Sequence, residues 1–141
     1  MVDISMPGRW FEEEIRRRIQ DGEGFDFEDL VDLVTERNVK MEKLAESFGP
    51  SDLRLPPVIA RGREDILELV GMLIEHYQSP AILGDTLALA VKITAQAAPL
   101  GDERIKEALN KWFCLIEEDD NLGDNDLAPK LVFSECRKTL F

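Results

Sequence analysis

Hydrophobic side chains recur at spacings of three and four residues along most of this chain, as they do in helices that bury one face. No segment alternates apolar and polar residues over the length of a strand, so the pattern predicts an all-α fold. Asn38 either separates two helices or lies inside a single bent one, which gives six or seven antiparallel helices. The expected helices lie at residues 8–20, in FDFEDLVDLVTERN, in VKMEKLAESFG, at 63–78, at about 80–98, from 102 through 116, and from about 127 to 140.

The most apolar of these helices covers about residues 80–98, and we expect the others to pack around it. Ser79 offers an N-cap at its start, and Gly101 follows its expected end. Between these two residues only Asp85 and Lys92 carry charge. A helix that is apolar nearly all round must be covered on most sides, so this one is predicted to be the centre of the domain.

One polar stripe interrupts this central helix. Asp85, Lys92 and Gln96 follow one another at spacings of seven and four residues and therefore share a face. That face is the expected exit of the helix from the core. On the other faces, a charge placed at Val91 is expected to unfold the domain.

The clearest helix start in the chain lies at Asp26, which is predicted to be an N-cap. Phe25 and Leu30 occupy the positions of a hydrophobic staple around it. The chain is predicted to form a single domain over 1–141, with an internal boundary in the Pro-rich loop 50–62.

The C-terminal half also resembles a known class of helical repeats. The units DILELVGMLIEHYQSPAILGDTLALAVKITAQ and RIKEALNKWFCLIEEDDNLGDNDLAPKLVFSECRK are similar to HEAT or armadillo repeats, over residues of about 64–140. Asp85 precedes an apolar run as an aspartate does in that family, whereas the arginine that commonly follows is missing. The resemblance implies stacked antiparallel helix pairs and, by analogy, a protein-binding role.

The charge balance limits the kind of partner. The chain has 17 basic and 29 acidic side chains, a formal net charge of −12. Direct binding to nucleic acid is not expected, because a phosphate backbone requires clustered Lys and Arg. A basic protein partner suits this charge.

Membrane insertion and secretion are not expected either. The longest apolar stretch, residues 81–98, is interrupted by polar side chains. The N-terminal segment MVDISMPGRW lacks the apolar core and positive run of a secretory signal. Cys114 and Cys136 lie in apolar contexts without a CxxC motif, so we expect buried, reduced thiols and a cytoplasmic location, although a disulfide between them stays open.

Acidic residues concentrate in two segments that contain no basic residue, 21–36 and 117–126. One interpretation is ordinary helix capping and solubility charge. The other is a negative surface that binds a basic partner. For that surface the predicted residues are Asp21, Glu23, Glu28, Asp29, Asp32, Glu117, Glu118, Asp119, Asp120 and Asp124.

Catalytic and metal-binding patterns are absent from the sequence. The chain has one histidine, His76, and an enzyme that uses Glu75 beside it is the least favoured alternative. The acidic loop fails the calcium pattern, because taking Gly123 as position six places Leu122 at five and Pro129 at twelve. We therefore expect no catalytic residue, no metal and no cofactor.

The preferred interpretation is a non-enzymatic, acidic helical module that binds a protein. An inhibitor or immunity protein that neutralises a basic, nuclease-like partner suits its size and charge. The alternative is a helical-repeat adaptor or regulatory subunit of a larger complex, in which the acidity serves solubility.

Overall fold

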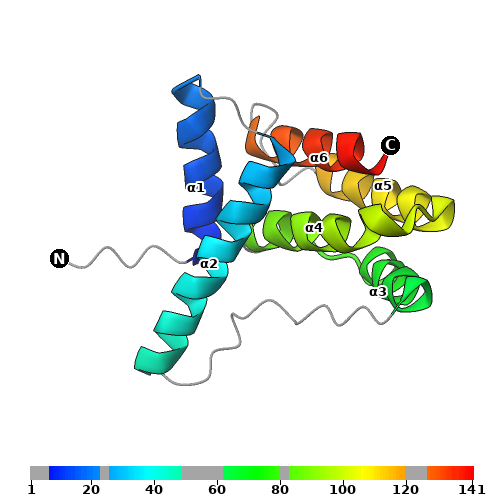
Figure 1. Cartoon of the computed structure of the whole chain (residues 1–141), viewed down its shortest axis with the longest axis horizontal. Helices are drawn as coiled ribbons and strands as arrows, with labels where there is room; N and C mark the ends of the chain where they lie inside the picture. The colour runs from blue at the N-terminus through cyan, green and yellow to red at the C-terminus, as the bar shows by residue number, and fades with distance from the viewer. Residues whose placement is uncertain (1–6, 23–25, 49–61, 80–82, 120–126) are drawn as a thin grey trace.

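The structure, a computed structural model, describes residues 7–22, 26–48, 62–79, 83–119 and 127–141. Within these ranges the chain forms six α-helices and one short 3₁₀-helix, with no strand. The all-α prediction is therefore confirmed. The elements are α1 (Pro7–Gln20), α2 (Phe27–Phe48), α3 (Arg63–Glu75), α4 (Leu83–Ala97), η1 (Ala98–Leu100), α5 (Glu103–Glu117) and α6 (Leu127–Leu140) (Figure 1).

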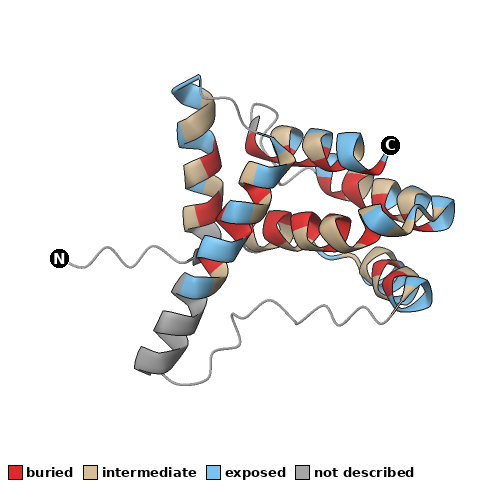
Figure 2. Cartoon of the chain, viewed as in Figure 1, coloured by how far each residue is buried: buried red, intermediate tan, exposed pale blue. Residues whose placement is uncertain are grey.

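The helix predicted to be central, α4, contacts each of the other five α-helices. Figure 1 shows α1 and α2 side by side across one end of it. Buried residues lie on most sides of α4 (Figure 2), because its small and branched apolar side chains let neighbouring helices approach from several directions. They are Gly84, Leu87, Ala88, Ala90, Val91, Ile93, Thr94 and Ala97.

The sequence predicts the C-terminal end of α4 correctly but not its N-terminal end. At the C-terminal end, η1 follows directly and stops at Gly101, whose φ of 60° lies in the left-handed region that favours glycine. At the N-terminal end, α4 begins at Leu83, so the N-cap predicted at Ser79 is wrong. The Ser79 hydroxyl donates instead to the carboxylate of Asp119.

Helix α2 is continuous through Asn38. Asn38 therefore lies inside one helix and does not separate two. The buried side chains Leu30, Leu33 and Val34 of α2 join the common core. Arg37, on the same helix, is only 1% exposed and donates to Asp85 of α4. An ion pair between α2 and α4 thus lies at the edge of the hydrophobic core.

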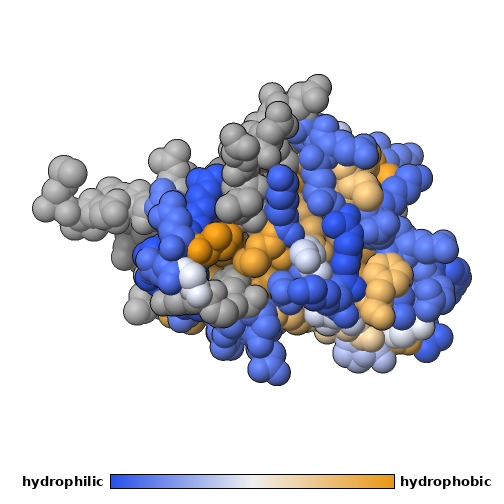
Figure 3. Space-filling view, turned by 90° about the horizontal axis from the view of Figure 1, so that it is seen from above, coloured by the Kyte–Doolittle hydropathy of each residue, from blue (hydrophilic) through white to orange (hydrophobic). Residues whose placement is uncertain are grey.

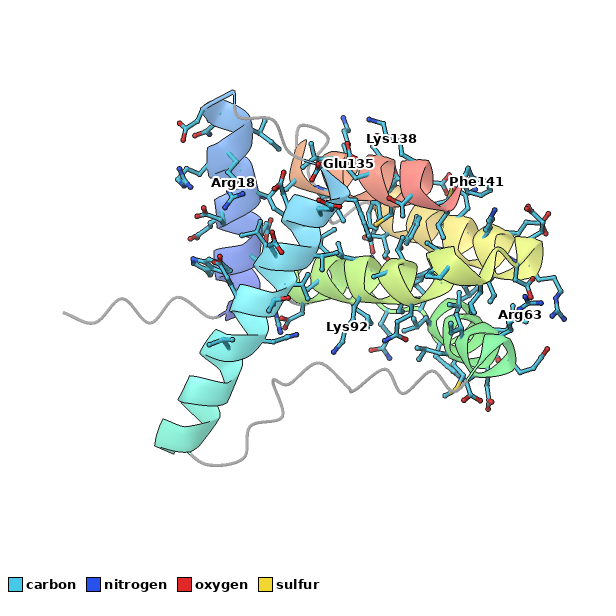
Figure 4. All side chains as sticks on the ribbon, in the orientation of Figure 1. Arg18, Arg63, Lys92, Glu135, Lys138 and Phe141 are labelled. Carbon is cyan, nitrogen blue, oxygen red and sulfur yellow. The ribbon has the colours of Figure 1, made fainter. Side chains whose placement is uncertain are left out.

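The polar stripe of α4 is its least buried side, as expected. Asp85, Lys92 and Gln96 are each half-buried. Figure 4 shows Lys92 extending from α4 on the side opposite α6. Asp85 does not simply face solvent, however, because its carboxylate binds the buried guanidinium of Arg37.

Helix α3 packs chiefly on α5, and the two helices run parallel. Near their N-terminal ends, Arg104 lies 3.4 Å from Glu64. Beyond their C-terminal ends, the Tyr77 hydroxyl donates to Asp119 at 2.7 Å. The antiparallel pairing of α3 with α4, and with it the HEAT-like arrangement, therefore stays a prediction.

Helices α5 and α6 meet through aromatic rings and one arginine. The rings of Phe113 and Phe133 stack with centroids 5.0 Å apart, and the Arg137 guanidinium lies 5.7 Å from the Phe113 centroid. Cys114 is half-buried and Cys136 buried, and both thiols are free. Burial raises the pKa of Cys136 to about 12, which keeps this thiol protonated.

Candidate functional site

Acidic residues on α1 are paired with arginines of the same helix. Arg16 lies 2.5 Å from Glu12, and Arg17 lies 2.5 Å from Glu14. Arg17 also reaches Asp21, 3.0 Å away and just past the helix end. Asp21, a predicted partner-binding residue, thus has an internal counterion. The outer face of α1 is charged but largely self-neutralised.

The first acidic residues of α2 cap the helix. The Asp26 carboxylate accepts a hydrogen bond from the Asp29 amide, and the Asp29 carboxylate accepts one from the Asp26 amide, both at 3.0 Å. This reciprocal arrangement confirms Asp26 as the N-cap and gives Asp29 a structural role. Phe25, the other half of the predicted staple, lies outside the described residues.

Three further carboxylates form a line along the outside of α2, and we call them the acidic stripe: Glu28, Asp32 and Glu36. Each is exposed and lies four residues from the next. Among the side chains that the structure describes, which on α2 end at Val39, none of the three carboxylates takes part in an ion pair or a side-chain hydrogen bond. Like charges four residues apart on a helix destabilise it by about 0.2–0.5 kcal/mol per pair. Unlike Glu12 and Glu14 of α1, these three carboxylates therefore have no counterion among the described side chains.

Carboxylates at the C-terminal end of α5 have internal partners instead. Arg137 of α6 donates to Glu117, and this contact raises the pKa of the arginine. Asp119 accepts from the hydroxyls of Tyr77 and Ser79. Both predicted partner-binding residues are thus engaged in holding α5 to its neighbours.

The remaining predicted residues divide into two kinds. Glu118 is exposed at the end of α5. Glu23, Asp120 and Asp124 lie outside the described residues. The face seen from above in Figure 3 is largely hydrophilic, with apolar side chains visible between the polar ones.

Tyr77 provides a spectroscopic test of the contact between the C-terminal ends of α3 and α5. Burial, then the hydrogen bond and charge of Asp119, raise its pKa above the ordinary 10.0. Since the folded state holds this proton more tightly, the stabilisation is complete below pH 10.0 and is lost as the pH rises toward the folded-state pKa. Tyr77 is the chain's one tyrosine, so the near-ultraviolet phenolate band reports it alone.

We expect the folded protein at about pH 11 to show little phenolate, with ionisation appearing together with unfolding. Tyr77→Phe should make stability less sensitive to pH in this alkaline range. A folded protein whose tyrosine titrates with a midpoint near 10 would contradict the contact between Tyr77 and Asp119.

Between α3, α4 and α5 lies an apolar groove with a volume of about 370 Å³. Its walls come from α3 and the residues that follow it, from the first half of α4, and from α5. The lining residues are Leu69, Met72, Leu73, His76, Tyr77, Gln78, Thr86, Leu89 and Trp112.

Sequence reasoning missed this groove. The periodicity of α3 assigns Leu73 and Tyr77 to the buried face together with Ile66, and in the structure both are only half-buried. One feature of the sequence could have indicated the groove: Leu69 and Met72 are apolar residues that do not belong to this face of α3. In the structure Met72 is 54% exposed.

Groups for catalysis or metal binding do not converge in the described part of the chain. His76 lines the groove and is exposed, and the neighbouring Glu75 is exposed as well. Among the described residues no group of three or more His, Cys, Asp or Glu is placed to hold a metal ion. None of the described helices is both long and apolar enough to cross a membrane.

Comparison of the chain with protein-family models, with curated proteins and with solved structures finds no match in any of the three. A functional proposal therefore rests on the chemistry of the acidic stripe and of the groove.

Proposed function

We propose that this protein binds a basic protein partner through the acidic stripe of α2 and has no catalytic activity of its own. The observation that carries the proposal is the line of three exposed carboxylates, Glu28, Asp32 and Glu36, which have no counterion among the side chains that the structure describes. A surface of this kind attracts cationic residues over several ångströms and speeds their association. The net charge of −12 adds to that attraction.

The energetics of α2 support a binding role over a purely structural one. The capping pair Asp26 and Asp29 stabilises the helix, as acidic residues at a helix start ordinarily do. The stripe begins at Glu28 in the first turn, where the helix dipole also favours a carboxylate, and continues to Asp32 and Glu36. Repulsion between neighbouring carboxylates of the stripe destabilises the folded state by about 0.4–1 kcal/mol over the two pairs. A basic partner would remove that repulsion. An inhibitor or immunity protein that neutralises a nuclease-like partner fits this description.

A second function, that of an adaptor or regulatory subunit, is favoured by a different observation. The apolar groove with its exposed Met72 offers a contact that does not depend on charge. Binding there would respond weakly to salt, whereas binding to the acidic stripe would weaken steeply as ionic strength rises.

The test uses the triple variant Glu28→Gln/Asp32→Asn/Glu36→Gln as bait beside the wild-type protein. We expect the wild type to capture a protein of net positive charge and the variant to lose it. At the same time the free energy of unfolding in urea should change by less than about 1 kcal/mol, because relief of the repulsion and loss of the favourable interaction of Glu28 with the helix dipole act in opposite directions.

The matched control is Glu13→Gln/Glu64→Gln/Glu107→Gln, which makes the same charge change at exposed positions of α1, α3 and α5. It should retain the partner. Equal capture by both variants would argue against the acidic stripe as the binding site.

A further inference from the structure

The groove between α3, α4 and α5 is shaped for apolar side chains that the described chain does not supply. Trp112, which is 3% exposed, lines it from α5, and Leu89 lines it from α4. The α3 wall presents Leu69, Met72 and Leu73, at spacings of three and one residues on one helical face. A helix that leaves Met72 more than half exposed has apolar surface still to be covered.

The open edge of this groove is acidic. On α3, Glu68 and Glu75 precede and follow Met72 at spacings of four and three residues, so all three share one stripe of the helix. Both glutamates are exposed. Asp119 lies at the other edge, held by Tyr77. Neither Glu68 nor Glu75 takes part in an ion pair among the side chains that the structure describes.

An apolar groove with an acidic edge favours some binding partners over others. A second copy of the chain would bring the same acidic edge and a net charge of −12 against it, which opposes self-association. An apolar groove formed by helices is suited to the apolar face of another helix, which inserts side chains spaced by three and four residues. The flanking positions of such a helix would face Glu68 and Glu75.

We propose that the groove binds an amphipathic helix of a partner protein, with leucine-like side chains inserted beside Met72 and Leu89, and with Lys or Arg on the flanks facing Glu68 and Glu75. This contact is separate from the acidic stripe of α2, so either proposal can fail alone. The two surfaces allow one basic partner to be held by charge at α2 and by an inserted helix at α3.

The experiment uses a fluorescent helical peptide with leucines at spacings of three and four residues and lysines on both flanks. Two comparison peptides carry glutamate in place of lysine, or the same residues in scrambled order. Binding is followed by fluorescence anisotropy with the wild-type protein, with Met72→Glu and with Phe141→Glu. Phe141 is 68% exposed and lies outside the groove lining, so its variant adds the same charge at a matched apolar position.

We expect the lysine peptide to bind with a Kd below about 100 μM, and the other two peptides to bind at least about tenfold more weakly. Met72→Glu should raise the Kd of the lysine peptide by about tenfold or more, because a charge then lies on the apolar wall of the groove. Phe141→Glu should leave its Kd within about twofold of the wild type.

Met72→Glu makes the protein more negative, so attraction by charge alone predicts equal or tighter binding of the lysine peptide. That result would overturn the groove while leaving the proposal for the acidic stripe intact. No binding of the lysine peptide at millimolar concentration, or equal binding of the scrambled peptide, would overturn the groove as well.

Discussion

Replacing Val91 by aspartate is expected to unfold this protein. Val91 is 1% exposed on α4, the helix that contacts all five other α-helices. A carboxylate at that position would be buried without a partner, which costs more than about 4 kcal/mol. Stabilities of natural domains lie at about 5–15 kcal/mol, so most of the folding free energy would be lost. Circular dichroism during thermal unfolding measures the effect.

The neighbouring variant Lys92→Asp is the control. Lys92 is half-buried on the outer stripe of α4, where a carboxylate can reach solvent. Its unfolding free energy should change by about 1 kcal/mol or less. If Val91→Asp melted at the wild-type temperature, α4 would not be the centre of the core.

The second large effect concerns the ion pair between Arg37 and Asp85. Arg37 is 1% exposed, whereas Asp85 is 27% exposed at the start of α4. Asp85→Ala would leave the buried guanidinium without its carboxylate, at a cost of about 3 kcal/mol. That figure is at the lower end for buried pairs because Asp85 is partly hydrated. Urea unfolding of the variant measures it.

The double variant Arg37→Met/Asp85→Ala distinguishes an unpaired charge from a general loss of packing. The Nε atom of Arg37 has no hydrogen-bond partner in the described part of the chain, so the guanidinium is not fully satisfied even in the wild type. Replacing the pair by apolar side chains should restore stability to within about 1 kcal/mol of the wild type. A double variant as unstable as Asp85→Ala would show that the charge was not the cause.

Local features of the chain were predictable because their causes lie within a few residues. The apolar composition of α4 requires burial on most sides, and the structure has it at the centre. Asp26 caps α2 because its carboxylate is within reach of an amide three residues away. Gly101 ends η1 because glycine adopts a positive φ without strain.

Contacts between distant residues were not predictable in this way. Arg37 follows Leu33 and Val34 at spacings of four and three residues, so the helical period places it on the buried face of α2. Its partner Asp85 lies 48 residues away, and only the packing of α2 on α4 brings the two side chains together. Ser79 has the chemistry of an N-cap, but Asp119, forty residues away, provides a competing acceptor for its hydroxyl. The pairing of α3 with α5 depends on such contacts as well.

The same distinction applies to the candidate sites. Composition locates the acidic segments, but it does not tell which carboxylates keep their charge uncompensated. Glu117 and Asp119 have partners on other elements, whereas Glu28 and Asp32 have none within the described ranges. The groove escaped prediction because its lining comes from three helices, and the pattern within each helix does not show how the three pack together.

The most direct test of the proposed function is the association rate constant of the captured partner, measured across ionic strength. For the wild-type protein we expect a rate constant that falls steeply as salt is added, since attraction by charge is screened over about 10 Å at 0.1 M. At low salt, Glu28→Gln/Asp32→Asn/Glu36→Gln should associate at least about tenfold more slowly. A rate constant that is the same in both proteins and independent of salt would contradict the account.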